Sequence, residues 1–204
     1  MKKFLAVLLS LTFICSMTYA EVDAVSSATI NMDNFPEIEA LDNGILVVYF
    51  STNDTVKAAA YTIAGTLSAE LFEIEPVEPY TEDDLNYYNN KSRSMAEMRD
   101  PKVRPEITAL PEDLTAYDTI ILCYPIWGGQ APKIICTFLE SADLSGKTII
   151  PFATSNSSGI GSSVKTLKTL TDESVIWQEG TGIRKGAAEE DIRLWAESLD
   201  LGER

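Results

Sequence analysis

The fold is decided by the stretch Ile45-Leu46-Val47-Val48-Tyr49-Phe50, which runs directly into Ser51-Thr52-Asn53-Asp54-Thr55. The apolar run is continuous and is preceded by Asp42-Asn43-Gly44, a pattern typical of a parallel strand that is buried on both faces. Thr55–Ala69 then shows helical spacing, with alanines on one face. A buried strand that turns at once into a helix predicts an α/β domain.

The same alternation continues along the chain. It predicts strands at Leu71–Glu75, Thr119–Cys123, Thr148–Ala153 and Val175–Glu179, and helices at Pro132–Ser141, Ser162–Leu170 and Gly186–Leu199. Strands that alternate with helices through right-handed crossovers predict a three-layer α/β fold with a five-stranded parallel sheet.

Residues 77–105 interrupt this pattern and are called the insert below. The insert is acidic and rich in Tyr and Asn, with a short helix expected near Ser92–Arg99. We expect a solvated lid without direct chemistry, because long irregular segments are commonly mobile or functional. The alternative is a cover for a ligand or a surface for a partner, formed by its aromatic and acidic residues Tyr80, Tyr87, Tyr88, Glu82, Asp83 and Asp84.

Composition excludes several classes of function. The chain of 204 residues has a formal net charge of −15 and no histidine. A field of that sign repels nucleic acid and favours basic partners. The lack of histidine excludes a His-based triad or a His-ligated zinc site, and no metal site is predicted. Cys123 and Cys136 are predicted to be buried apolar thiols.

The N-terminus predicts export. Lys2 and Lys3, the apolar stretch Phe4–Ile14 and the small residues around Ala20 form the pattern of a secretory signal peptide over residues 1–20. A lipid anchor at Cys15 is the alternative. Residues 21–43 are then a leader or tether, residues 44–204 form the folded domain, and we expect no transmembrane span after cleavage.

Three loops follow predicted strands and would open on the sheet edge where ligands of parallel α/β folds bind. The first, Ser51, Thr52, Asn53, Asp54 and Thr55, places hydroxyl groups and free N–H groups at a helix N-terminus, where a phosphate binds readily. An ordinary helix cap explains the same residues.

The second and third loops are suited to a flat aromatic ligand. In the second, Pro125 and Ile126 precede an exposed Trp127, and Gly128-Gly129 permits close approach. The third offers small donors and glycines for the polar edge of a ring, at Thr154, Ser155, Asn156, Gly159 and Gly161. The alternatives are a Trp that lies on the domain's own surface and a flexible Gly/Ser turn.

These motifs resemble the flavodoxin-like family, especially its small bacterial branch, over residues 44–200. The similar segments are Ile45–Ser51, Phe72–Pro76, Lys91–Ser94, Tyr124–Gly128 and Pro151–Ser163. The resemblance implies strand order 2-1-3-4-5, FMN as cofactor and electron transfer as activity. The first loop departs from the family pattern, since it is a residue shorter, lacks Gly and carries Asp54. A carboxylate there would repel the FMN phosphate.

The leader carries a second resemblance. Asp23-Ala24-Val25-Ser26-Ser27-Ala28-Thr29 is similar to the motif at which exported proteins receive FMN through a phosphoester to Thr, with Ser27 in place of the usual Gly. By that analogy Thr29 is the attachment point. A plain Ser/Ala-rich linker is the alternative.

Three functions follow from these observations. The first is an exported FMN electron carrier with a basic redox partner, whose acidic surface lowers the reduction potential of the flavin. The second is a flavodoxin-fold binding module that has weakened or lost FMN binding. The third is a small flavin-dependent quinone-type reductase, for which the sequence offers no catalytic residue.

Overall fold

The structure is a computed structural model, and it describes residue 38 and residues 40–202. The predicted signal peptide, most of the leader and Thr29 lie outside the described residues. The strands and helices are β1 (Ile45–Tyr49), α1 (Asp54–Leu67), β2 (Glu70–Glu73), α2 (Arg93–Arg99), β3 (Thr119–Pro125), α3 (Lys133–Ser141), β4 (Thr148–Ser155), α4 (Gly161–Leu167), the 3-10 helix η1 (Lys168–Leu170), β5 (Ile176–Trp177), β6 (Thr181–Arg184) and α5 (Glu189–Glu197).

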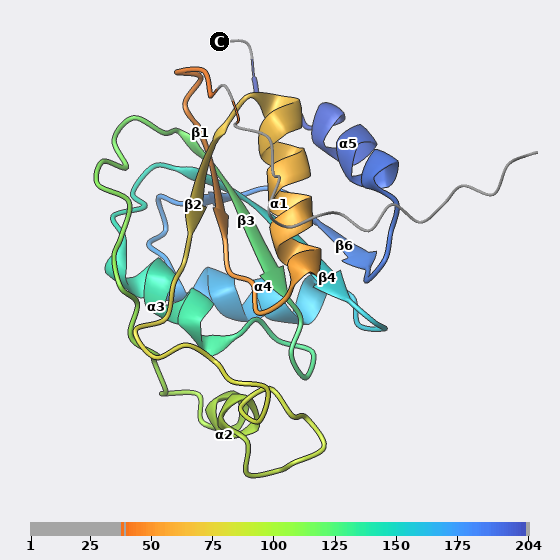
Figure 1. The fold of residues 1–204 in the computed structure, drawn as a ribbon. Helices are drawn as coiled ribbons and strands as arrows, with labels where there is room; N and C mark the ends of the chain where they lie inside the picture. Colours follow the sequence, from red (N-terminus) through yellow and green to blue (C-terminus); the bar gives the residue numbers. More distant parts are fainter. Residues whose placement is uncertain (1–37, 39, 203–204) are drawn as a thin grey trace, which may run out of the picture. The chain divides into compact units, whose positions relative to one another are not determined.

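The sheet has the predicted order, β2-β1-β3-β4-β5, and its strand pairs are parallel. Figure 1 shows helices on both of its faces. A parallel strand needs a crossover to reach the next one, and α1, α3 and α4 supply it between the neighbouring pairs β1 and β2, β3 and β4, and β4 and β5. α5 follows the last strand and covers the sheet without joining two strands.

The fifth position of the sheet is divided between two short strands, which the sequence did not predict. β5 pairs with the first half of β4, at Thr148 and Ile149, and β6 pairs in parallel with the second half. Pro151 lies between these halves and has no N–H to donate to a neighbouring strand. At Gly180, between β5 and β6, a Cβ would lie 1.9 Å from the Pro151 carbonyl oxygen. The edge strand is therefore interrupted where the proline approaches it.

Alternate residues of the strands supply two cores, one on each face of the sheet. On one face Ile45, Val47 and Tyr49 pack with residues of α1 and α5. On the other, Leu46 and Val48 pack with residues of α3 and with Leu167 of α4. Both faces of β1 are buried, as its continuous apolar run predicts.

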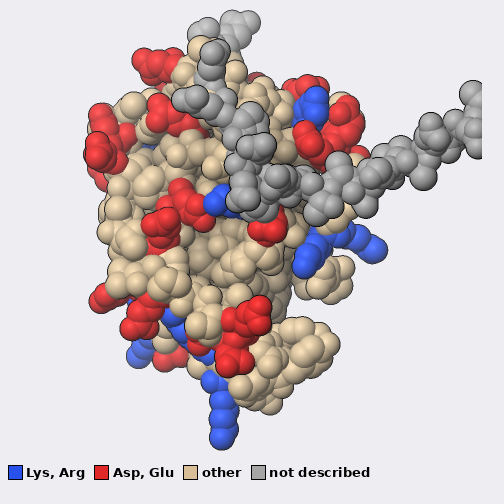
Figure 2. Space-filling model, viewed as in Figure 1, with Lys and Arg blue, Asp and Glu red and all other residues tan. Residues whose placement is uncertain are grey.

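The strands end at a common edge, and the insert with α2 lies beyond that edge in Figure 1. The fold thus brings the insert to the side of the molecule where the predicted ligand loops lie. Figure 2 shows Asp and Glu side chains spread widely over the visible face, with fewer Lys and Arg side chains among them. This distribution agrees with the net charge of −15.

Candidate functional site

The first candidate loop, Ser51–Thr55, closes on itself. Asn53 is the N-cap of α1, and its side-chain Oδ1 accepts a hydrogen bond from the Thr55 N–H at 3.0 Å. The Ser51 hydroxyl donates to the carbonyl oxygen of Asn53. The cap explanation is therefore correct for Asn53, while the hydroxyls of Thr52 and Thr55 have no hydrogen-bond partner among the described residues.

One charged residue lies within this loop, and another follows it closely in sequence. Asp54 is exposed in the first turn of α1, where a negative charge stabilises the helix dipole. Lys57, the nearest basic residue in sequence, is directed elsewhere, because its Nζ pairs with Glu73 Oε2 at 3.5 Å. A phosphate at this helix end would be held by N–H and hydroxyl groups without a lysine.

The second and third loops are joined through the backbone. Pro125 is the register partner of Thr154 across β3 and β4, and the Ile126 N–H donates to the Thr154 carbonyl at 2.9 Å. The sequence placed Tyr124, Pro125, Thr154 and Ser155 in loops, but they belong to strands, because these hydrogen bonds extend the ladder beyond the apolar runs.

Trp127–Gln130, called the Trp127 turn below, is a tight two-residue turn. The N–H and carbonyl of Trp127 bond to the carbonyl and N–H of Gln130 at 2.9 and 3.0 Å. Gly128 and Gly129 have φ values of 54° and 82°. Positive φ at both central positions favours glycine, so the turn's own geometry requires these residues whether or not a ligand approaches.

Trp127 is partly buried and not exposed as the sequence predicted. Its ring lies edge-to-face against Phe50 and Tyr80, with centroids 5.8 and 5.5 Å away. Phe50 and Tyr80 are themselves 5.8 Å apart. The three rings form an aromatic cluster that fixes the indole, since such pairs stabilise each other beyond their buried area.

The Thr154 loop, Thr154–Gly161, is exposed at its tip and anchored at both ends. Ser155 Oγ accepts hydrogen bonds from the N–H groups of Ser157 and Ser158 at 3.2 and 2.8 Å. At the other end Ser163 donates to the Ile160 carbonyl at 2.7 Å and bonds to the Tyr124 hydroxyl at 3.0 Å. The loop is held in place and is not a free Gly/Ser turn.

Two features of these loops fit a bound ring. Gly159 and Gly161 lack positive φ, and a Cβ built at either would meet no atom within 4 Å, so the protein's own packing does not require glycine there. Gln130, at the end of the Trp127 turn, has a buried Oε1 without a hydrogen-bond partner among the described residues. A ring N–H would satisfy such an acceptor.

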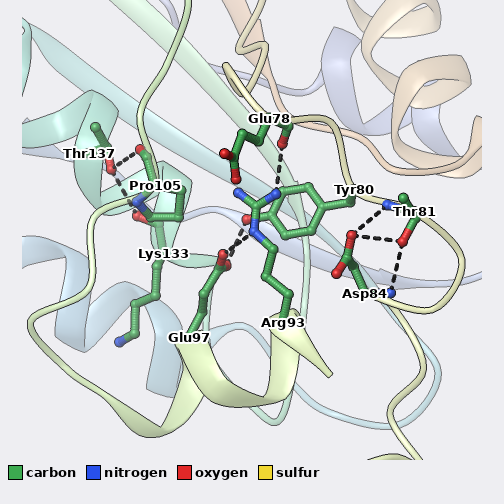
Figure 3. Close-up of polar contacts among 9 residues, drawn as sticks. All are labelled: Glu78, Tyr80, Thr81, Asp84, Arg93, Glu97, Pro105, Lys133 and Thr137. Carbon is green, nitrogen blue, oxygen red and sulfur yellow. Dashed lines mark hydrogen bonds and ion pairs between the residues drawn. The ribbon is translucent and has the colours of Figure 1, made fainter. Parts of the chain in front are cut away.

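The insert contributes Tyr80, which the sequence offered only as a possible ligand cover or partner surface, and two residues that the sequence did not assign to the site, Arg93 and Glu97. Tyr80, Arg93 and Glu97 are in mutual contact (Figure 3). Tyr80 also touches the ring of Trp127. The spacing of Arg93 and Glu97 predicts a helical ion pair. No sequence signal relates either residue to Tyr80 or Trp127. Tyr87 and Tyr88 of the insert are exposed, at 63% and 83% of their surface.

Cys123 and Cys136 are free and buried, which confirms the prediction of apolar thiols. Burial raises the pKa of both thiols. Over the described part of the chain, no three His, Cys, Asp or Glu side chains are grouped as metal ligands. None of the helices described is long and apolar enough to cross a bilayer.

The comparisons with known proteins agree with this geometry. A flavodoxin family model matches residues 44–199, and the chain belongs to the flavodoxin family. The family resemblance and the strand order are thereby confirmed. Among the curated proteins, no significant match to this chain was found.

Solved structures of similar fold agree with this family assignment. A candidate flavoprotein of Bacteroides eggerthii DSM 20697 is 41% identical, with a TM-score of 0.71 over 78% of this chain and 98% of its own. A second, from Bacteroides uniformis ATCC 8492, is also 41% identical, with a TM-score of 0.71 over 76% and 97%. A flavoprotein of Lactobacillus acidophilus NCFM, solved in complex with FMN, shares the fold at 20% identity, with a TM-score of 0.59 over 74% and 97%.

Proposed function

We propose that this flavodoxin binds FMN and transfers electrons outside the cytoplasm. One observation carries the FMN proposal: the Ile126 N–H, directly before the Trp127 turn, bonds to the Thr154 carbonyl and so holds the Trp127 turn beside the Thr154 loop at the carboxyl edge of the sheet. The complex of the Lactobacillus acidophilus flavoprotein, which shares the fold, supports FMN as the ligand. FMN would supply one- and two-electron redox chemistry, and the protein would bind and position it.

The residues present suit the two halves of FMN differently. The ring would lie beside Trp127 and against the Thr154 loop, with Gln130 Oε1 free to accept a hydrogen bond. The phosphate would use the hydroxyls of Thr52 and Thr55 and the free N–H groups at the start of α1. The redox partner would be a basic protein, because a net charge of −15 attracts positively charged surfaces.

The site of action and the mode of attachment are proposed from the sequence alone. The pattern of residues 1–20 supports export through a signal peptide, and residues 21–43 would form the leader. Within that leader Thr29 is the proposed acceptor if FMN is held covalently. Both proposals concern residues outside the described part of the chain.

A flavodoxin-fold binding module without a soluble flavin is the second candidate. It is favoured by the Ser51–Thr55 loop, in which Ser51 and Asn53 already bond within the loop and Asp54 adds a negative charge. A carboxylate near a phosphate dianion costs more as water is excluded from the pair. A quinone-type reductase is a third candidate, which NAD(P)H-dependent turnover without a partner protein would support.

Expression in an export-competent host followed by acid precipitation separates the first two candidates. Yellow colour in the supernatant indicates dissociable FMN, and yellow colour in the pellet indicates a covalent flavin. Thr29→Ala should abolish pellet colour only, whereas Thr55→Ala should weaken dissociable binding. A colourless protein that takes up no added FMN would overturn the FMN proposal and support the binding module.

A further inference from the structure

The insert is fixed to the candidate site through Tyr80. The Tyr80 ring contacts both Phe50, which follows β1, and Trp127, at centroid distances of 5.8 and 5.5 Å. The insert therefore touches the Trp127 turn directly, and at this point it is not the loosely solvated lid that the sequence predicted. What keeps Tyr80 in place decides how firmly the indole is oriented.

A compact network of charged groups also holds Tyr80 (Figure 3). Its hydroxyl donates to Glu97 Oε2 at 2.7 Å, and the Arg93 guanidinium lies over its ring, 4.1 Å from the centroid. Arg93 Nε also donates to Glu97 Oε1 at 2.8 Å, and its Nη1 donates to the Glu78 carbonyl at 2.8 Å. Each group of the network thus has a partner.

Burial makes this network different from a surface ion pair. Glu97 is only 6% exposed, and a carboxylate at that depth needs hydrogen-bond donors to offset its lost hydration. Burial and the Glu97 carboxylate raise the pKa of the Tyr80 hydroxyl, so that the hydroxyl remains a hydrogen-bond donor well into the alkaline range. By contrast, the Arg193 pair with Glu189 on α5 has the same spacing but lies in solvent, with side chains 46% and 59% exposed.

We propose that Glu97 and Arg93 are positioning residues that lock Tyr80 against Trp127 and so preset the orientation of the indole before any ligand binds. The part of the inference that concerns ligand affinity rests on the proposed FMN function. The part that concerns Trp127 does not, because the contacts exist in the protein alone. Preorganisation of this kind raises affinity by reducing the ordering that binding would otherwise require.

The test uses Glu97→Gln and Tyr80→Phe in the full-length chain, with Glu189→Gln as the matched control. Glu97→Gln removes the charge opposite Arg93, and Tyr80→Phe removes only the hydroxyl. The first readout is the near-ultraviolet circular dichroism of the apoprotein. The contribution of Trp127 in each variant is the difference between its spectrum and the spectrum of the same variant that also carries Trp127→Phe. The second is FMN affinity, measured below the unfolding transition of every variant.

We expect both insert variants to lose most of the Trp127 dichroism and to bind FMN about tenfold more weakly. The double variant should be little worse than either single one, because both remove the same restraint. Glu189→Gln should change neither readout. Unchanged Trp127 dichroism in Tyr80→Phe would overturn the inference, even if Glu97→Gln fails to fold. Lost dichroism in a protein that never binds FMN would support it while the FMN proposal fails.

Discussion

A single methyl group tests whether the Thr154 loop faces a ligand. In Gly159→Ala the new Cβ meets no atom within 4 Å, and the backbone is not in the left-handed region. The apoprotein should therefore keep its stability or gain about 0.4–1 kcal/mol, because alanine restricts the unfolded chain. If a flavin ring lies against the loop, the same methyl overpacks it at a cost of about 1–3 kcal/mol, which weakens binding roughly 5- to 150-fold.

Gly129→Ala is the matched control, because its effect on the stability of the apoprotein should be opposite to that of Gly159→Ala. At φ 82° an alanine is strained by about 1–2 kcal/mol, so the apoprotein should lose stability by that amount. The assays are urea unfolding of the apoprotein and titration of FMN fluorescence for both variants. A Gly159→Ala apoprotein that is less stable by more than about 1 kcal/mol, or that binds FMN as tightly as the parent protein does, would show that the Thr154 loop does not face a ligand in this way.

Three further predictions concern the helix end, the divided edge strand and the thiols. Asp54→Asn should lower the free energy of unfolding by about 0.3–1 kcal/mol, because the favourable interaction of the carboxylate with the helix dipole is lost. The same change should raise FMN affinity several-fold, because it removes the repulsion between the carboxylate and the phosphate. Urea unfolding measures the first effect and FMN titration the second, and weaker FMN binding by the variant would contradict the prediction. Gly180→Ala should lower stability by about 3 kcal/mol or more, because its Cβ would collide with the Pro151 backbone and ring; a thermal melt like that of the parent protein would count against this. Cys123 and Cys136 should resist alkylation at pH 8 until the protein unfolds, because burial keeps both thiols protonated and inaccessible to the reagent. Mass spectrometry measures the labelling, and rapid labelling of the folded protein would show that the thiols are not buried.

The central strands were predictable because their side chains are buried on both faces. Continuous apolar runs at 45–50, 119–123 and 148–153 indicate strands of a parallel sheet that has helices on both faces. The strand order was predicted from the family resemblance. β6 was not predictable in this way. Its residues Thr181–Arg184 include a glycine and are partly exposed, and β6 is a strand apart from β5 because Pro151 interrupts the edge between them.

The loops of the candidate site were predictable, but the contacts between them were only partly so. Parallel strands end at one edge, which is why the loops after β3 and β4 were expected together. The burial of Trp127 depends on Tyr80, which is distant in sequence and lies in a segment without periodicity. Such a contact is decided by tertiary packing, which residue spacing does not encode.

Binding of FMN at the three loops is tested most directly by an NMR titration of the isotope-labelled full-length protein with FMN, followed through backbone amide shifts. We expect saturable shifts concentrated at Thr52–Thr55, in the Trp127 turn and in the Thr154 loop, with the side-chain amide of Gln130 among them. Shifts that are absent at saturating FMN, or that cluster away from these three loops, would contradict this expectation.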